Sequence, residues 1–276
     1  MGFNQQQFKI ALQDVRDTLS VGDNLPEIGQ PQGMSLQVFE TLPSTNQTLW
    51  ELLNQGAASG TVVIAQQQTA GRGQWGRQWQ STVGGLYLSL ALTPNIQASN
   101  SAQLTLCSAW GIATALRSYD IPVFLKWPND LLHLGRKLGG ILTETRVHQG
   151  QITKAVVGVG INWSNAVPEM GIALQSFCEE QLSPRPRVTS LEQLAAIVIQ
   201  GIKFGYQRWS EQGIDSLLLS YLELLDSRGR QVIVDGHPGM ITGVTPSGEL
   251  RICLNSAAAP IEICLKPGTI SLGYHG

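Results

Sequence analysis

The chain has 276 residues, a length that fits one large core together with an accessory module. Hydrophobic residues make up 42% of the chain and charged residues 14%, so there is ample apolar surface for a core and global disorder is disfavoured. A formal net charge of -2 argues against the broad positive surface of a protein that lives on nucleic acid.

The sequence lacks the usual signs of membrane insertion, secretion and metal binding. No stretch approaches the roughly 18 apolar residues that a spanning helix needs, and the N-terminus has no secretory pattern. We therefore expect a cytoplasmic protein without a membrane partner. Four scattered cysteines and four scattered histidines match neither a disulfide framework, a zinc site nor a histidine-based triad.

The first third of the chain reads as a helix, a link and the start of an α/β pattern. Residues 3–20 predict an amphipathic helix, and a Gly/Pro-rich link follows to about residue 33. The segment LQVFETL predicts a strand, and Ser44-Thr45-Asn46-Gln47 resembles an N-cap with a capping box before a helix that reaches about Asn54. Strands at 62–65 and 86–92 bracket the irregular loop QQQTAGRGQWGRQWQS.

The remaining elements intermix helices and strands before an all-β tail. Predicted helices lie at 101–118, 190–210 and 214–225, and predicted strands at 123–126, 139–144 and 155–160. In the tail, VIVDG, GMITGVTP, ELRICL and IEICL alternate with turn residues and predict a small β-barrel. This mixture indicates an α/β or α+β core.

The glycine loop fits neither common nucleotide motif. Gly71, Gly73 and Gly76 have the G-x-G-x-x-G spacing, and the outer two also have phosphate-loop spacing. A phosphate loop requires Lys and then Ser or Thr after its last glycine, whereas Arg77 and Gln78 stand there.

The charge around this loop points to an anionic ligand. A dinucleotide fold requires an acid about 20 positions later, but no Asp or Glu occurs between Glu51 and Asp120. Arg72, Arg77 and Arg117 fall in this acid-free interval, so the loop should lie in a positive field. The alternative is a surface loop whose arginines are only solvated.

Five segments in order resemble the biotin protein ligase family. They are Ser44-Thr45-Asn46, Gln68-Thr69-Ala70-Gly71-Arg72-Gly73-Gln74-Trp75-Gly76-Arg77-Gln78-Trp79, Lys126-Trp127-Pro128-Asn129-Asp130, Lys137-Leu138-Gly139-Gly140-Ile141-Leu142-Thr143-Glu144 and Gly158-Val159-Gly160-Ile161-Asn162. The resemblance implies an α+β fold like that of class II aminoacyl-tRNA synthetases and biotin ligases, a mixed sheet with helices on one side. It also implies an N-terminal helix and linker at 1–33, a catalytic domain at 34–227 and an SH3-like β-barrel at 228–276.

The resemblance further implies an ATP-dependent biotin–[biotin carboxyl-carrier protein] ligase. Such an enzyme forms biotinyl-5'-AMP and pyrophosphate from biotin and ATP. It then transfers biotin to a lysine of the biotin carboxyl carrier domain of acetyl-CoA carboxylase, with Mg²⁺ as cofactor. Because residues 1–33 are too short for a DNA-binding domain, we expect a monofunctional enzyme without specific DNA binding.

The family motifs assign roles to particular residues. The residues expected to bind biotin are Ser44, Thr45, Asn46, Gln68, Gly71, Arg72, Gly73, Gln74, Lys137 and Gly140. The residues expected to bind ATP or the adenylate are Arg72, Arg77, Trp79, Asn129, Lys137 and Asn162. Lys137, Lys126 and Arg72 are the expected catalytic residues, and Asp130 is the candidate Mg²⁺ ligand.

One departure from the family pattern and two alternative functions bear on this expectation. The family loop usually carries a second arginine where this chain has Gln74, and losing that charge predicts looser retention of the adenylate. A lipoate or octanoyl transferase is the nearest alternative enzyme, although the GRGQWGRQW and KWPND segments favour biotin. A biotin-responsive DNA-binding repressor is the alternative from another class. Oligomeric state, including a homodimer, stays open.

Overall fold

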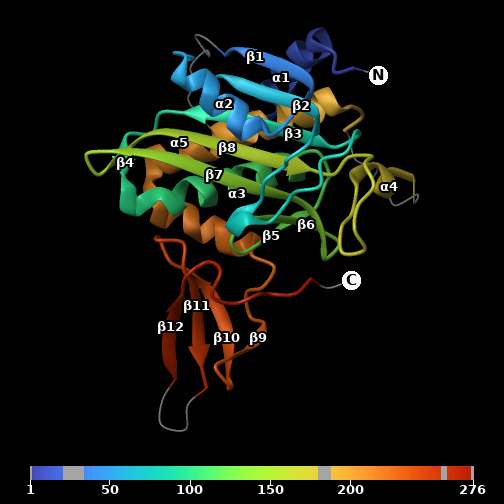
Figure 1. Cartoon of the computed structure of the whole chain (residues 1–276). Coiled ribbons are helices and arrows are strands. Elements are labelled where there is room, and N and C mark those ends of the chain that lie inside the picture. Colours follow the sequence, from blue (N-terminus) through green and yellow to red (C-terminus); the bar gives the residue numbers. More distant parts are fainter. Residues whose placement is uncertain (1, 21–33, 180–187, 256–259, 275–276) are drawn as a thin grey trace.

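A mixed sheet forms the main body of the protein in the computed structural model, which describes residues 2–20, 34–179, 188–255 and 260–274 (Figure 1). Within these residues eight strands pair in the order β1-β2-β3-β8-β7-β6-β5, with the short β4 paired to β8. Strands β1 and β2 are parallel, and the other neighbours are antiparallel. The strands are β1 Leu36–Leu42, β2 Val62–Gln68, β3 Leu86–Leu92, β4 Ile96–Gln97, β5 Val123–Lys126, β6 Asp130–His133, β7 Arg136–His148 and β8 Gln151–Ile161.

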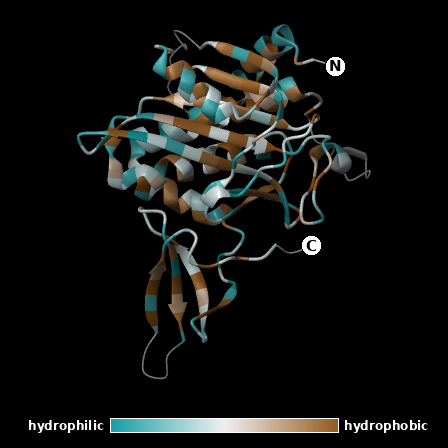
Figure 2. Ribbon diagram, viewed as in Figure 1, coloured by the Kyte–Doolittle hydropathy of each residue, from teal (hydrophilic) through white to brown (hydrophobic). Residues whose placement is uncertain are grey.

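Alternation along the central strands sends apolar side chains to both faces of the sheet. In β2, Val62 and Ile64 join the larger hydrophobic core, while Val63 and Ala65 join a smaller cluster on the opposite face. Figure 2 shows hydrophobic residues along the strands and hydrophilic residues at the tip of the β7–β8 hairpin. Burial on both faces explains why β2 reads as a continuous apolar run.

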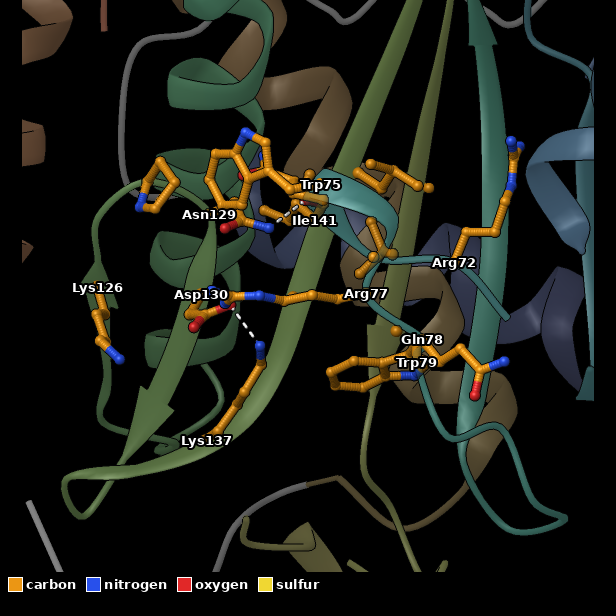
Figure 3. A pocket seen from close by; sticks show the side chains of 18 of the residues that line it. Arg72, Trp75, Arg77, Gln78, Trp79, Lys126, Asn129, Asp130, Lys137 and Ile141 are labelled. Atoms are coloured by element: carbon orange, nitrogen blue, oxygen red, sulfur yellow. Dashed lines mark hydrogen bonds and ion pairs between the residues drawn. The ribbon is translucent and has the colours of Figure 1, made fainter. Parts of the chain in front are cut away.

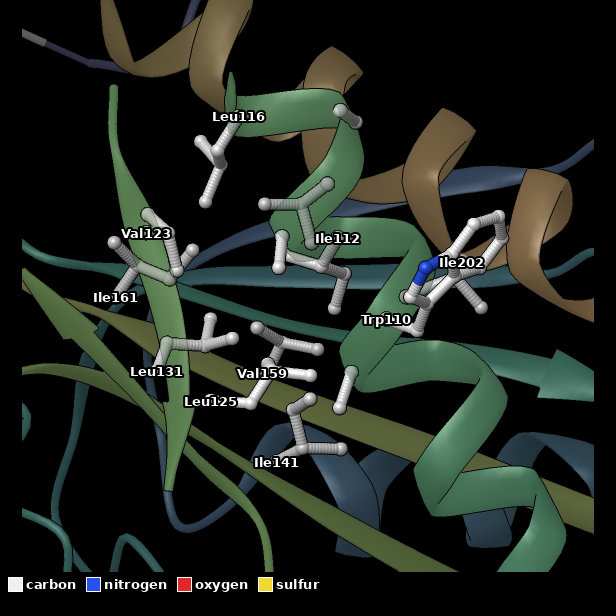
Figure 4. Packing of buried hydrophobic residues seen from close by; sticks show 14 of the residues in the cluster. Trp110, Ile112, Leu116, Val123, Leu125, Leu131, Ile141, Val159, Ile161 and Ile202 are labelled. Carbon is white, nitrogen blue, oxygen red and sulfur yellow. The ribbon is translucent and has the colours of Figure 1, made fainter. Parts of the chain in front are cut away.

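Three helices cover the face of the sheet that carries the larger core: α1 Gln5–Ser20, α3 Ser101–Arg117 and α5 Leu191–Leu224. Figure 4 shows Ile112 and Leu116 of α3 packed towards Leu125, Val159 and other strand residues. Helices α3 and α5 approach closely because Gly111 faces the backbone at Gly201 and Gly205, where a Cβ atom would clash.

The long α5 is broken by Gly213, whose backbone is non-helical with φ 78°. The two helices predicted near 190–210 and 214–225 are therefore confirmed, with the break between them. No helix in the described residues is both long and apolar enough to cross a membrane. The short α4 Leu174–Glu179 closes one of the described ranges, and the predicted link up to residue 33 falls mostly outside the described residues.

Helix α2, Thr45–Asn54, packs on the other face of the sheet through Leu49 and Leu53. The predicted capping box at its start is wrong: Ser44 occupies the N-cap position but makes no side-chain cap hydrogen bond. Instead the Thr45 N–H donates to Oε1 of Gln68 at 2.8 Å. An acceptor from β2 therefore satisfies a free helix N–H, and it ties α2 to the sheet.

The C-terminal part forms a second, four-stranded antiparallel sheet among the described residues, in the order β12-β11-β10-β9. Its strands are β9 Gln231–Val234, β10 His237–Val244, β11 Leu250–Leu254 and β12 Ile261–Leu265. The expected SH3-like barrel is corrected to this open sheet, because β9 and β12 stand at opposite edges and do not pair in the described structure.

The small sheet is anchored to the main body. Trp127 donates its indole N–H to the carbonyl of Gly248 at 2.9 Å, and Leu250 and Ile252 belong to the main hydrophobic core. After β12 the chain returns towards β5 and β6 (Figure 1). The α+β class and the order of the main elements are thus confirmed, and β6 is a strand that the sequence pattern did not indicate.

Candidate active site

A cavity of about 420 Å³ opens where the glycine loop, the strands β5–β8 and the C-terminal segment meet. Residues 44–46 of the α2 start, 72–75 and 77–79 of the glycine loop, 126–130, and 268–272 with Tyr274 all contribute to its lining. Its described lining includes four cations, Arg72, Arg77, Lys126 and Lys137, and one carboxylate, Asp130. The cavity is therefore an anion-attracting site.

Most of the predicted site residues come together here. The residues that line the cavity are Ser44, Thr45, Asn46, Gln68, Arg72, Gly73, Gln74, Arg77, Trp79, Lys126, Asn129, Asp130, Lys137 and Gly140. They lie on α2, four strands and two loops, so only the folded sheet brings them together.

Two predicted residues do not line this cavity. Gly71 lines a neighbouring second cavity instead, and a Cβ atom there would overlap the Trp79 carbonyl and Ser81 Oγ, so glycine permits this close approach. Asn162 accepts a hydrogen bond from Asn165 at 3.0 Å, and its backbone N–H donates to Leu138 at 2.9 Å. In this structure Asn162 supports the start of β7.

One end of the cavity is a network of neutral hydrogen-bonding groups. The Ser89 hydroxyl donates to Asn46 Oδ1 at 2.6 Å and lies 2.8 Å from Thr45 Oγ1. Gln68 accepts from Thr45 and donates its amide N–H to Ser81 Oγ at 2.7 Å. Because Thr45 and Asn46 are almost fully buried, these contacts fix the direction of each polar group.

Glu144 joins this network to the glycine loop. Its Oε2 accepts hydrogen bonds from Asn46 at 2.9 Å, Arg72 at 3.0 Å and Trp50 at 3.3 Å. The carboxylate thus holds Asn46 and Arg72 in one arrangement.

The other end of the cavity is built around Asp130 (Figure 3). Lys137 Nζ lies 2.7 Å from Asp130 Oδ1, and the Tyr274 hydroxyl donates to Oδ2 at 2.5 Å. Lys126 Nζ lies 3.2 Å from the centroid of the Tyr274 ring. Arg77 extends from the glycine loop towards this group (Figure 3).

Burial lowers the pKa of Lys126 from its ordinary value to about 8, and the neighbouring Asp130 partly opposes that shift. Lys137, Arg230 and Arg77 lower the same pKa further because like charges disfavour the ammonium. Burial also raises the pKa of the Tyr274 phenol, and the adjacent Asp130 carboxylate adds to this effect. Tyr274 is therefore a neutral hydrogen-bond donor at physiological pH.

Trp79 and the strand glycines form the wall between the two ends. The Trp79 indole packs on Gly160, where a Cβ atom would overlap it, and Lys137 Nζ lies 5.3 Å from its ring centroid. The Trp79 Nε1 and Gln74 Oε1 atoms are buried and have no hydrogen-bond partner among the described residues. Two unsatisfied polar atoms beside a cavity are positions where a polar ligand can bind.

The donor set does not form a prebuilt metal site. Both Asp130 oxygens are engaged by Lys137 and Tyr274, and no group of three metal-ligating side chains occurs in the described residues. Asn129 donates its amide to the Ile141 carbonyl at 2.7 Å and so supports the turn before β6. A metal role for Asp130 would require it to release one partner.

Three contributing residues were not identified from sequence: Ser89, Glu144 as a site residue, and Tyr274. Ser89 lies in the apolar strand β3. The sequence marks it only as a polar residue that alternates with leucines and so points to the other face of the strand. A second cavity of about 700 Å³ adjoins the first and shares residues 72–75, 77–78, Pro128 and Leu142 with it.

Comparison with known proteins agrees with this geometry. Residues 38–162 match the profile of the Biotin/lipoate A/B protein ligase family. The bifunctional ligase/repressor BirA of Bacillus subtilis is 40% identical over 132 residues, which are 47% of this chain and 41% of that protein. The chain thus matches less than half the length of that relative.

Two further relatives match over nearly their whole length. The biotin–[acetyl-CoA-carboxylase] ligase of Mycobacterium tuberculosis is 31% identical over 266 residues, 90% of this chain and 92% of that protein. The structure of a biotin protein ligase from Aquifex aeolicus in complex with biotin and ATP superposes with a TM-score of 0.67 at 26% identity, covering 83% of this chain and 95% of that one. The chain therefore belongs to the biotin/lipoate A/B protein ligase family, alongside the biotin protein ligases.

Proposed function

We propose that this protein is an ATP-dependent biotin protein ligase. It forms biotinyl-5'-AMP and pyrophosphate, and then transfers biotin to a lysine of a biotin carboxyl carrier domain of acetyl-CoA carboxylase. The observation that carries the proposal is one cavity that joins a neutral hydrogen-bonding end to a cationic end. Biotin has a neutral ureido head, which suits the neutral end of the cavity, and a carboxylate tail, which suits the cationic end.

The neutral end is the place for the ureido group. Thr45, Asn46 and Gln68 hold fixed donors and acceptors, and Ser89 orients two of them. A site built to hydrogen-bond a polar head rejects ligands without that head by about 10⁴ to 10⁵. This arrangement favours biotin over a purely aliphatic acyl group.

The cationic end suits adenylation. Bringing a carboxylate against the α-phosphate of ATP joins two anions, and negative charge then moves to the departing pyrophosphate. Lys126, Lys137 and Arg77 face this end of the cavity. A preorganised charge of this kind stabilises the transition state by about 3–4 kcal/mol, by analogy with oxyanion-hole donors.

Mg²⁺ enters in this proposal with ATP, as a counter-ion of its phosphates. Magnesium sites of this type use one or two carboxylates together with phosphate oxygens and water. Asp130 is the only carboxylate among the described lining residues of the cavity. Asp130 would hold the ion once one of its oxygens is released from its contact with Lys137 or Tyr274.

Transfer requires a neutral acceptor lysine to attack the mixed anhydride while AMP departs. The same cations that neutralise pyrophosphate would stabilise AMP, and the enzyme mainly positions the acceptor. We place the reaction in the cytoplasm, where ATP is available.

The test uses purified protein with biotin, MgATP and an unmodified biotin carboxyl carrier domain. We expect biotin-dependent pyrophosphate release without the acceptor, and a biotin mass increment on one acceptor lysine when it is added. An acceptor with that lysine changed to arginine is the control. Preferential use of lipoate would favour the lipoate transferase alternative, and absence of both products with biotin would refute the proposal.

A further inference from the structure

The C-terminal segment after β12 is part of the cavity wall. Residues 268–272 and Tyr274 line the cavity, although the family resemblance assigned this segment to the accessory domain. The segment touches the main body at two places. Gly268 lies against the Trp75 indole, where a Cβ atom would be 3.2 Å away, and Tyr274 reaches Asp130 and Lys126.

Tyr274 contacts two charged groups of opposite sign. Its hydroxyl donates to Asp130 Oδ2, while Lys137 occupies the other oxygen of the same carboxylate. Its ring faces the Lys126 ammonium at 3.2 Å, a cation–π contact. One side chain therefore acts on both charges at once.

Strand pairing explains why such a residue is needed. Lys126 and Asp130 stand opposite each other in the β5–β6 ladder, so their side chains are neighbours. Yet the ion pair of Asp130 is made with Lys137, and Tyr274 contacts both Asp130 and Lys126. A Lys126–Asp130 pair would neutralise a cation that faces the cavity.

We propose that Tyr274 is a positioning residue of the adenylation centre, which orients the Asp130 carboxylate and keeps the Lys126 ammonium out of an ion pair with Asp130. This inference rests on the proposed function for its kinetic consequences. Its geometric part, the covering of Lys126 by the tyrosine ring, is independent of that function.

Two substitutions separate the two contacts. Tyr274→Phe removes the hydrogen bond to Asp130 and keeps the ring over Lys126, while Tyr274→Leu removes both. With the full chain, biotin and MgATP, we expect Tyr274→Phe to lower kcat for pyrophosphate release roughly tenfold, the value of one hydrogen bond to a charged group. The KM for biotin should stay unchanged, because Tyr274 does not contact the neutral end. Tyr274→Leu should lower kcat further.

A second measurement needs no turnover. Brief acetic anhydride labelling, quantified at each lysine by mass spectrometry, reports how accessible and how reactive Lys126 is relative to the exposed Lys9. We expect faster labelling of Lys126 in Tyr274→Leu, and wild-type labelling in Tyr274→Phe. The matched control is Tyr206→Phe, a tyrosine that packs on Trp209 and does not line the cavity.

Each outcome decides the inference. Wild-type kcat in Tyr274→Phe overturns the orienting role, and unchanged Lys126 labelling in Tyr274→Leu overturns the covering role. A parallel loss of kcat, biotin affinity and melting temperature in Tyr274→Phe would point to a merely structural residue and contradict the proposal. If wild-type protein releases no pyrophosphate, the proposed function fails, and labelling alone still decides whether the ring shields Lys126.

Discussion

Gly158 in the centre of β8 leaves the space in which the Asn46 amide lies. A Cβ atom at this position would overlap Asn46 Oδ1 and approach Asn46 Nδ2 at 3.0 Å. Gly158→Ala should therefore displace an amide that accepts from Ser89 and donates to the Leu142 carbonyl and Glu144. The backbone of β8 itself tolerates alanine, because Gly158 does not need a positive φ.

The expected magnitude follows from those three hydrogen bonds. At about 1 kcal/mol net each, losing them lowers the free energy of unfolding by roughly 3 kcal/mol. Overpacking by one methyl group in a tight site costs about 1–3 kcal/mol by itself, which is the same range. If Asn46 also bonds biotin, the Kd for biotin should rise roughly tenfold or more.

The assay is a double-mutant cycle that combines Gly158→Ala with Asn46→Ala, measured by denaturant unfolding and by biotin calorimetry. Removing the Asn46 amide empties the space that the added methyl group needs, so the double mutant should be more stable than the sum of the single effects predicts. Gly140→Ala is the stability control, because its Cβ would make only ordinary contacts of 3.4 Å or more. Additive effects, or unchanged biotin affinity in Gly158→Ala, would refute the reasoning.

The remaining predictions concern charges in the cavity. Because burial lowers the pKa of Lys126 to about 8, the ammonium loses its charge and kcat/KM for adenylation should fall as the pH rises past 8. Lys126→Arg should move this decrease to higher pH. If the decrease occurs at the same pH in Lys126→Arg, Lys126 is not its origin. Glu144→Gln should raise the KM for biotin by releasing Arg72. It should change the free energy of unfolding by under about 1 kcal/mol, because the Arg72–Glu144 ion pair is partly exposed. An unaltered KM would contradict a role of Glu144 in holding Arg72 for biotin binding. Gln74→Arg should slow the release of biotinyl-AMP in a filter or gel-filtration assay, and an equal release rate would contradict a retention role.

The order of elements and most cavity residues could be predicted from the sequence. The glycine loop and the KWPND and KLGG segments consist of contiguous residues, so their resemblance to a known family could be recognised along the chain and carried the assignment of most site residues. The interruption between the two predicted helices at 190–210 and 214–225 coincides with Gly213, whose positive φ is a local backbone feature that glycine favours.

Contacts between distant residues could not be predicted in this way. Tyr274 acts on Asp130, 144 positions away, and nothing near Tyr274 in sequence marks it. Serine is a preferred N-cap residue, but the Ser44 side chain does not cap α2. Gln68 of β2 supplies the acceptor to the helix instead, a tertiary contact that local sequence rules omit. Asn162 belongs to a matching motif, yet its partners are backbone groups of β7 and the side chain of Asn165.

The glycines of β7 and β8 have a consequence for altering ligand choice. Gly140 pairs with Gly160, and Gly158 pairs with Leu142, so these three glycines contribute no side chain of their own to this stretch of the cavity wall. A ligand site is usually widened by trimming a side chain, but here there is nothing to trim. Analogues larger in this direction cannot be accommodated by any substitution at these glycines, whereas every substitution there narrows the cavity. Room for a bulkier biotin analogue has to be made at the opposite wall, in the glycine loop or the C-terminal segment.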